Sequence, residues 1–273
     1  MIYQEIKPPP LLQGCVERYW VLEANFPKTA EWEQAVIPTI QESVVFLYGD
    51  RFTVEDNTGI VHIGPQSLLI GQFTSVSINR LAGKIGAIGI HFKPAGFFRL
   101  FGIPSRHFTD GKTDFEIILG KEAHLLTEQI MEAKGLNQRV ALLDQFLLKK
   151  AAGASPKLTS TEYAIGLIQA HDGNLTVAGL ADSVKVSIKS LERHFLERVG
   201  LYPKMFARIA RFNATIRHMG ACPHSTWHDV VHRFGYYDQA HFIKEFKKFS
   251  GKTPSDYFAG KIDLDKFFLG TPN

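Results

Sequence analysis

The sequence predicts a two-domain α+β protein, in which an antiparallel β-barrel or sandwich followed by helices precedes an all-α domain. Three observations predict this fold class. Short β-type runs, separated by Gly, Asn and Asp, follow one another between residues 16 and 92. A pattern of helix, break and helix occurs twice, at 175–200 and 225–251. The small, polar stretch KKAAGASPK at 149–157 separates these two kinds of sequence, as a linker would.

The β-type segments alternate with turn residues and are followed by helical patterns. The segments are CVERYWVLE, ESVVFLYGD, RFTVED, GIVHIG, QSLLIGQF, SVSINRL and KIGAIGIHF. After Pro94 we expect a short helix at FFRLFG and longer helices at 114–132 and 137–150. The predicted organisation is therefore a first domain at 1–150, a linker at 151–158, a second domain at 159–260 and a tail at 261–273.

The first repeated unit has the local signals of two short helices. Thr176 is an N-cap candidate, and the break falls at Lys185 and Val186, before a second N-cap at Ser187. The expected inward faces are Val177, Leu180, Ala181 and Val184 in the first helix and Leu191, Phe195 and Val199 in the second. The opposite face of the second helix is therefore expected to be exposed.

The second unit repeats this plan with different residues. Thr226 and Asp229 have the spacing of a capping box, and Gly235 is placed to end the first helix. Asp238 is expected to cap the next helix. The inward faces are Trp227, Val230, Val231 and Phe234, then Phe242, Phe246 and Phe249. A single long helix from about Pro203 to Met219 is predicted to join the two units.

Two such units in tandem are typical of helix-turn-helix proteins, whose second helix enters a DNA major groove. Residues 160–258 resemble the AraC/XylS family of bacterial transcription regulators. The resemblance depends on Leu180-Ala181, Ser187, Leu191, Arg193, Phe195, Gly200, Pro203, Arg211, Phe234-Gly235-Tyr236, Asp238-Gln239, His241-Phe242, Phe246-Lys247, Gly251 and Thr253-Pro254. The chain departs from the family at Lys185, where a turn glycine is usual, and at Val231, Thr215 and His218.

The first domain has a weaker resemblance of its own. GIHFKPAGFFRLFGIP, followed by HFTDG, resembles the sensor-like, cupin-like barrel domain that accompanies many AraC-type regulators. The resemblance implies a ligand-responsive regulator whose first domain senses a small-molecule effector or pairs two subunits. Its implied partners are double-stranded DNA, the effector, RNA polymerase and a second copy of the chain. The alternatives are a first domain that only dimerises or binds a protein partner, and an enzyme with an attached DNA-binding module.

The charge distribution agrees with DNA binding by the second half. The chain holds 31 basic and 27 acidic residues; residues 1–155 hold 15 and 16, whereas 156–273 hold 16 and 11. Basic excess in the helix-turn-helix half suits phosphate contacts. Without an apolar run of eighteen residues or a signal-peptide pattern, we expect a cytoplasmic protein with no membrane partner. The two cysteines, Cys15 and Cys222, suggest no disulfide framework.

The resemblance assigns roles to side chains on the two recognition helices. Base edges should be read by Lys189, Glu192 and Arg193 on the first helix, and by Gln239, His241 and Lys244 on the second. Glu192 could accept from cytosine or orient Arg193. Phosphate contacts are expected from Lys204, Lys247, Lys248 and Lys252. The ligand-binding residues stay unknown.

No catalytic motif, cofactor or metal is expected. The chain has no GxSxG, no phosphate-binding loop and no dinucleotide fingerprint. His224, His228 and His232 fall at helical spacing, but we expect exposed or groove-facing histidines because nothing is placed to complete a zinc site. His62 and His91 lack the HxH pair of a cupin metal site. We therefore expect a barrel that binds an organic small molecule without metal.

Two apolar segments could take part in subunit pairing. The helices of the first domain carry more apolar residues than one buried face requires: Leu125, Ile130, Leu136, Val140, Leu143 and Leu147. The tail is also apolar, with Leu264, Phe267, Phe268 and Leu269. It could dock on the first domain or on a second subunit.

Overall fold

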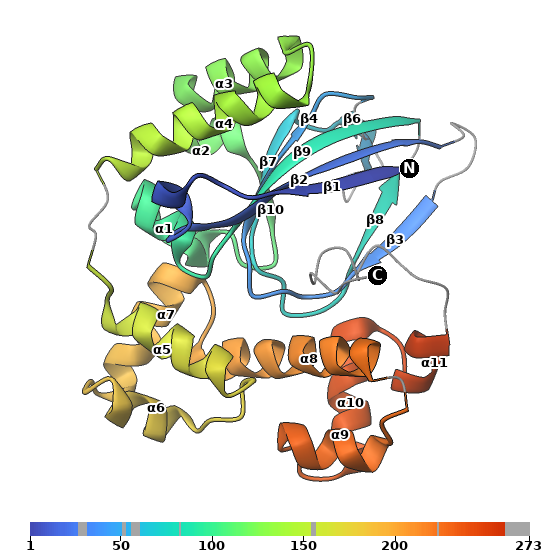
Figure 1. Cartoon of the computed structure of the whole chain (residues 1–273), viewed down its shortest axis with the longest axis vertical. Helices are drawn as coiled ribbons and strands as arrows, with labels where there is room; N and C mark the ends of the chain where they lie inside the picture. The colour runs from blue at the N-terminus through green and yellow to red at the C-terminus, as the bar shows by residue number, and fades with distance from the viewer. Residues whose placement is uncertain are drawn as a thin grey trace.

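The computed structural model describes residues 1–26, 32–50, 53–55, 61–81, 83–153, 157–222 and 224–259. An antiparallel sheet with covering helices forms the N-terminal half, and helices alone form the C-terminal half (Figure 1). The predicted fold class, a β-rich part followed by an all-α part, is confirmed. The predicted tail at 261–273 lies outside the described residues.

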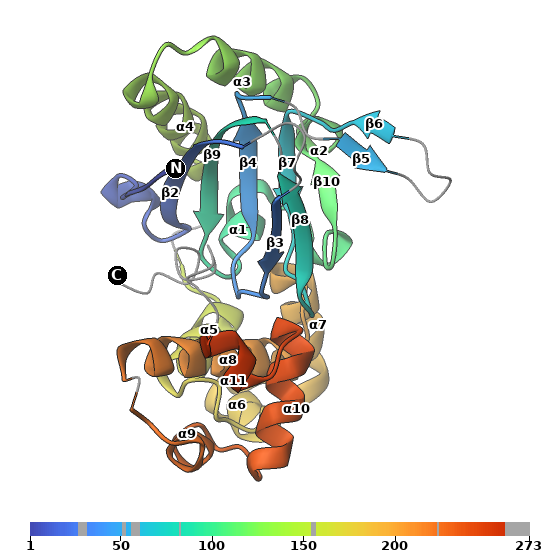
Figure 2. The same cartoon turned by 90° about the vertical axis from the view of Figure 1, so that its right-hand side faces the viewer.

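The main sheet has six strands in the order β1-β2-β9-β4-β7-β10, and all its neighbours are antiparallel. The strands are β1 (Ile2–Ile6), β2 (Val16–Asn25), β4 (Ser43–Leu47), β7 (Ser67–Ile70), β9 (Lys84–Phe92) and β10 (Lys112–Asp114). Two further pairs lie beside it: β3 (Trp32–Val36) with β8 (Ser77–Leu81), and β5 (Thr53–Glu55) with β6 (Val61–Ile63) (Figure 2). Each predicted β-segment contains a strand.

The described strands do not close into a barrel, which was one of the two arrangements that the sequence predicted. β1 and β10 are the two ends of the main sheet, and β3 and β8 pair only with each other there. The physical reason is that helices cover one face of the sheet. That face includes Tyr19 and Val21, which pack with the helices, whereas the alternate residues Trp20 and Leu22 belong to a small cluster on the other face.

The covering helices are α1 (Gly96–Phe101), α2 (Phe115–Leu119), α3 (Lys121–Glu132) and α4 (Leu136–Ala151). The predicted helix at 114–132 is thus divided in two. Gly120, at φ +58°, ends α2 and begins α3, a conformation that glycine adopts at little cost. Tyr19 Oη donates to Asp144 Oδ1 at 2.7 Å and so ties the sheet to α4.

The C-terminal half contains α5 (Ser160–Ala170), α6 (Val177–Ser183), α7 (Ile188–Val199), α8 (Pro203–Ala221), α9 (Trp227–Phe234), α10 (Gln239–Ser250) and α11 (Pro254–Ala259). The predicted linking helix is confirmed as α8, with Pro203 in its first turn. Seven phenylalanines form the centre of this half, each less than 2% exposed: Phe195, Phe206, Phe212, Phe234, Phe242, Phe246 and Phe249. No helix among the described residues is long and apolar enough to cross a membrane.

The two halves contact each other through specific bonds. Asn213 Nδ2 on α8 donates to the carbonyl of Pro38 at 2.9 Å, and Ile37 belongs to the core of the C-terminal helices. Arg99 Nη1 on α1 lies 3.0 Å from Glu162 Oε1 on α5. Thr109 Oγ1 donates to the carbonyl of Gly200, directly after α7, at 2.7 Å. The N-terminal half is therefore attached to α5, α7 and α8.

Candidate DNA-binding surface

The first helix-turn-helix unit consists of α6 and α7. Thr176 caps α6 by accepting from the Gly179 N–H at 3.1 Å, which confirms the predicted cap. Lys185, in the turn, adopts φ +55°. The turn thus keeps the left-handed conformation that a glycine would favour, although a lysine occupies it at some cost in strain.

The recognition helix α7 buries one face and exposes the other. Ser187 Oγ accepts from the Ser190 N–H at 3.1 Å, and Leu191, Phe195 and Val199 are buried as predicted. The outer face borders a surface hollow lined by Ser187, Lys189, Ser190, Glu192, Arg193, Leu196 and Tyr202. The three predicted base-reading side chains of this unit are therefore brought together on one surface.

The second unit repeats this architecture with α9 and α10. Both bonds of the predicted capping box between Thr226 and Asp229 are present. Gly235 follows α9 at φ +65°, and a Cβ there would lie 2.4 Å from Asn174 Oδ1. Asp238 Oδ1 caps α10 by accepting from the His241 N–H at 2.7 Å. The predicted breaks and caps of this unit are confirmed.

A buried carboxylate fixes α10 on the linking helix. Glu245 is 4% exposed and accepts from Arg208 Nε at 2.7 Å and from Arg211 Nη2 at 2.8 Å. Arg211 also lies over the Tyr236 ring, 4.4 Å from its centroid. This cluster was not predicted from the sequence, although Glu245 lies three residues after Phe242 and four before Phe249, on the same helical face.

The linking helix sets the separation of the two units. α7 and α10 lie near opposite ends of α8 (Figure 1) and on the same side of it (Figure 2). α8 has 19 residues, which corresponds to a length of about 28 Å. Successive major grooves on one face of B-DNA are about 34 Å apart. The length of α8 is thus close to the spacing of adjacent grooves, and slightly shorter.

The predicted base-reading residues of the second unit differ in how free their side chains are. Gln239 and Lys244 are exposed on α10. The His241 ring is tied to its own helix, because Nδ1 accepts from the Tyr237 N–H at 3.3 Å and Nε2 lies 3.8 Å from Glu245 Oε2. The four predicted phosphate-binding residues are all exposed: Lys204, Lys247, Lys248 and Lys252.

Three exposed apolar or aromatic side chains on this surface were missed by the sequence analysis. Tyr237, in the turn before α10, is 90% exposed, and Tyr202, beside Arg193 in the hollow, is 52% exposed. Ile188 begins α7 and is 45% exposed. For Ile188 and Tyr237 the available signal was an apolar or aromatic residue next to the N-cap of a recognition helix, Ser187 or Asp238, whereas Tyr202 is itself the N-cap of α8.

The described histidines lie apart from one another or in exposed pairs. Among the described residues, no group of three or more His, Cys, Asp or Glu side chains could hold a metal ion. His228 and His232 are exposed neighbours with ring centroids 5.4 Å apart. His91 is buried, and its Nδ1 lies 2.5 Å from Ser43 Oγ. Burial lowers the pKa of His91 to about 3, so its ring stays neutral.

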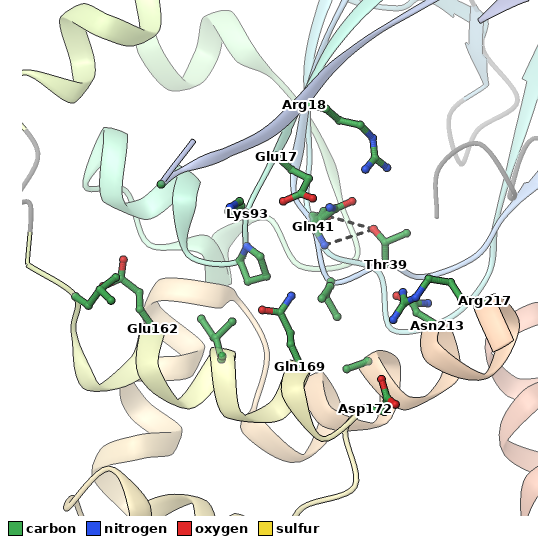
Figure 3. Close-up of a pocket in the computed structure, with 17 residues that line it drawn as sticks. Glu17, Arg18, Thr39, Gln41, Lys93, Glu162, Gln169, Asp172, Asn213 and Arg217 are labelled. Carbon is green, nitrogen blue, oxygen red and sulfur yellow. Dashed lines mark hydrogen bonds between the residues drawn. The ribbon is translucent and has the colours of Figure 1, made fainter. Parts of the chain in front are cut away.

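A cavity of about 410 Å³ lies between the two halves (Figure 3). The loop at 39–41 and the start of β2 form one wall, and α5 and α8 form the other. This location differs from the expected pocket inside the strands. There, the Trp20 ring covers Gly89 so closely that a Cβ would lie 2.2 Å from Trp20 Cε2.

Comparisons with known proteins agree with this surface. Residues 180–260 match a family model described as a helix-turn-helix domain, and residues 4–114 match a domain of unknown function, DUF6597. No similar sequence was found among curated proteins.

The chain is also similar to several solved structures. ToxT from Vibrio cholerae O395 has 13% identity over 88% of this chain and 97% of that chain, with a TM-score of 0.47. Unsaturated fatty acid-bound ToxT from strain SCE256 has 15% identity over 88% and 94%, with a TM-score of 0.46. ToxT from O395 bound to (E)-4-(8-methylnaphthalen-1-yl)but-3-enoic acid has 12% identity over 95% and 99%, with a TM-score of 0.48. These values are too low to transfer a ligand or a function.

The two units and the matching family model define a DNA-binding protein of the helix-turn-helix class. More specifically, the family model matches residues 180–260 as a helix-turn-helix domain, the part of the chain in which the resemblance to the AraC/XylS regulators predicted such units.

Proposed function

We propose that the chain is a transcription regulator that reads two adjacent major grooves with α7 and α10, in response to a small molecule. The observation that supports this most directly is the rigid attachment of both recognition helices to α8, by buried phenylalanines and by the Glu245 ion pairs. In this proposal Lys189, Arg193, Gln239 and Lys244 contact base edges. The exposed lysines at 204, 247, 248 and 252 contact phosphates.

The size of α8 gives the proposal a geometric consequence. Its length of about 28 Å is shorter than the separation of adjacent grooves, about 34 Å. DNA that contacts both helices should therefore bend towards the protein, at a cost of a few kcal/mol. Footprinting is expected to show two protected segments about one turn apart with unrelated sequences. A palindromic site contacted by one unit per chain would contradict the proposal.

Single substitutions test the assignment of the groove surface. Arg193→Ala and Lys244→Ala should each weaken specific binding, and Arg193→Ala should cost about 1–3 kcal/mol and relax the preference at one base pair. Lys121→Ala is the matched control, because Lys121 is an exposed lysine on α3, in the other half of the chain. An operator affinity unchanged by Arg193→Ala would show that α7 is docked differently.

The N-terminal half, with boundaries near 150 and 158, is proposed to sense the effector. Supporting this, it contacts α5, α7 and α8 directly and shares a cavity with them. A cytoplasmic location, pairing of two chains and contact with RNA polymerase belong to the same proposal, as does the absence of an enzymatic activity. Few of the six apolar residues on the helices of the N-terminal half are free to pair two chains. Ile130, Leu143 and Leu147 are buried, and only Leu125 is counted among the exposed large apolar side chains, at 47%.

A further inference from the structure

The cavity between the two halves is lined by side chains with unused hydrogen-bonding capacity. Figure 3 shows Glu17, Lys93 and Gln41 on the side of the sheet, and Gln169, Asp172 and Arg217 on the side of the helices. Its volume of about 410 Å³ is near the lower end of the range for small-molecule pockets, roughly 300–1,000 Å³. A ligand of modest size would thus contact both halves at once.

Charges of both signs face this cavity without a direct partner. Two of its charged residues are already paired, Arg18 with Glu5 at 3.0 Å and Glu162 with Arg99 at 3.0 Å. Glu17, Lys93, Asp172 and Arg217 differ, because none of these four forms an ion pair with another described residue. The cavity therefore offers two cations and two carboxylates outside ion pairs, and of these the Asp172 carboxylate acts on the Arg217 guanidinium.

The balance of charge restricts the chemistry of the ligand. A strongly anionic ligand such as a nucleotide would meet the carboxylates of Glu17 and Asp172, and a cationic one would meet Lys93 and Arg217. A long-chain lipid would find a lining that is largely charged or amide in character. A molecule with one positive and one negative group satisfies both kinds of side chain, and the amides of Gln41 and Gln169 can complete its hydrogen bonds.

We propose that this cavity binds a small zwitterion, a free amino acid or a dipeptide, with its carboxylate on Arg217 and its ammonium group on Glu17. A guanidinium matches a carboxylate in a two-pronged hydrogen bond better than an ammonium group does, which favours Arg217 over Lys93 for this role. Partial removal from water lowers the pKa of Arg217 and the Asp172 carboxylate raises it; the side chain is still exposed, and a bound carboxylate would act in the same direction as Asp172.

The two contacts come from different halves of the chain. Glu17 lies on β2, and Arg217 lies on α8, the helix that carries both helix-turn-helix units. Bound zwitterion therefore stabilises the arrangement of the halves seen here relative to one in which they separate. This inference rests on the proposed sensing function, for which it names the class of effector.

The test uses the full chain and thermal unfolding. Each standard L-amino acid, and dialanine as a dipeptide, is added at millimolar concentration. At least one is expected to raise Tm by several degrees in proportion to occupancy. Its N-acetyl derivative and its carboxamide, which each lack one charge, should not. Arg217→Gln and Glu17→Gln should each abolish the shift, Arg217→Lys should retain part of it, and Lys121→Gln should leave it intact.

Three outcomes would overturn the inference. These are no shift with any amino acid or dipeptide, an equal shift with the capped derivatives, and a shift unaffected by both cavity variants. Far-ultraviolet circular dichroism of each variant checks that it is folded. Operator binding without ligand is measured on the same preparations. If the wild-type chain binds DNA but no ligand shifts its Tm, the proposed ligand class is wrong and the proposed DNA-binding function is unaffected. If the wild-type chain does not bind DNA, the proposed function is wrong, and the Tm shifts still test ligand binding in the cavity.

Discussion

Glu245→Ala should destabilise the protein and disable its second recognition helix. The carboxylate is 4% exposed and is bonded to Arg208 and Arg211, whose side chains are 27% and 12% exposed. Removing it leaves two partly buried guanidiniums without their partner. Breaking a buried pair costs about 3–5 kcal/mol, and the partial exposure of Arg208 favours the lower end, about 3 kcal/mol. Urea unfolding measures this difference.

The same variant should alter DNA binding in a specific way. Glu245 faces α8 rather than the outer surface, so its effect on DNA must come through the orientation of α10. Footprinting should show weaker protection of the half-site bound by α10, with the half-site of α7 retained. Glu128→Ala, which removes a carboxylate 57% exposed on α3, is the control and should change stability by less than about 1 kcal/mol. A loss below about 1 kcal/mol for Glu245→Ala would refute the reasoning.

Three further predictions concern strain, burial and pH. Lys185→Gly should stabilise the chain by up to about 1 kcal/mol, because glycine accepts φ +55° without strain; a lower urea midpoint would contradict this. Gly89→Ala should destabilise it by at least about 2 kcal/mol, since the new methyl group meets the Trp20 ring at 2.2 Å, and an unchanged Tm would contradict that contact. Burial raises the pKa of Glu42 from 4.5 to about 8. Because the folded state then holds its proton more tightly, the free energy of unfolding should fall as pH rises from about 4.5 to about 8. Glu42→Gln should remove this dependence in urea unfolding, and a slope that persists would point to other groups.

Much of the C-terminal half was predictable because its signals are local. Caps such as Ser187 and Asp238 lie next to the helices they begin, and the inward residues repeat every three or four positions. The turn at Lys185 shows the limit of such signals. The family pattern indicates a glycine there, and only the structure shows that the lysine keeps the left-handed conformation.

In the N-terminal half the positions of most strands were predictable, but the way in which the strands pair was not. Each β-segment contains a strand, yet β1, β3 and β10 were missed, because strands of three to five residues carry little periodic signal. Closure into a barrel depends on pairing between distant segments, which alternation does not specify. The cavity was missed for the same reason, since Glu17, Lys93 and Arg217 are brought together only by the contact between the halves.

The contacts between the halves also suggest how the proposed effector could change DNA binding. Gln41 lines the cavity, and the next residue, Glu42, accepts from Ser105 Oγ at 3.2 Å. That hydroxyl lies 3.2 Å from the carbonyl of Arg198, in the last turn of α7. Thr109 holds the carbonyl of Gly200, directly after the same helix. Under the proposed function, a ligand that moves the loop at 39–41 therefore acts on the end of the first recognition helix. Ser105→Ala together with Thr109→Ala should leave DNA binding measurable but weaken its dependence on the ligand, and an unchanged dependence would place the coupling in α8 instead.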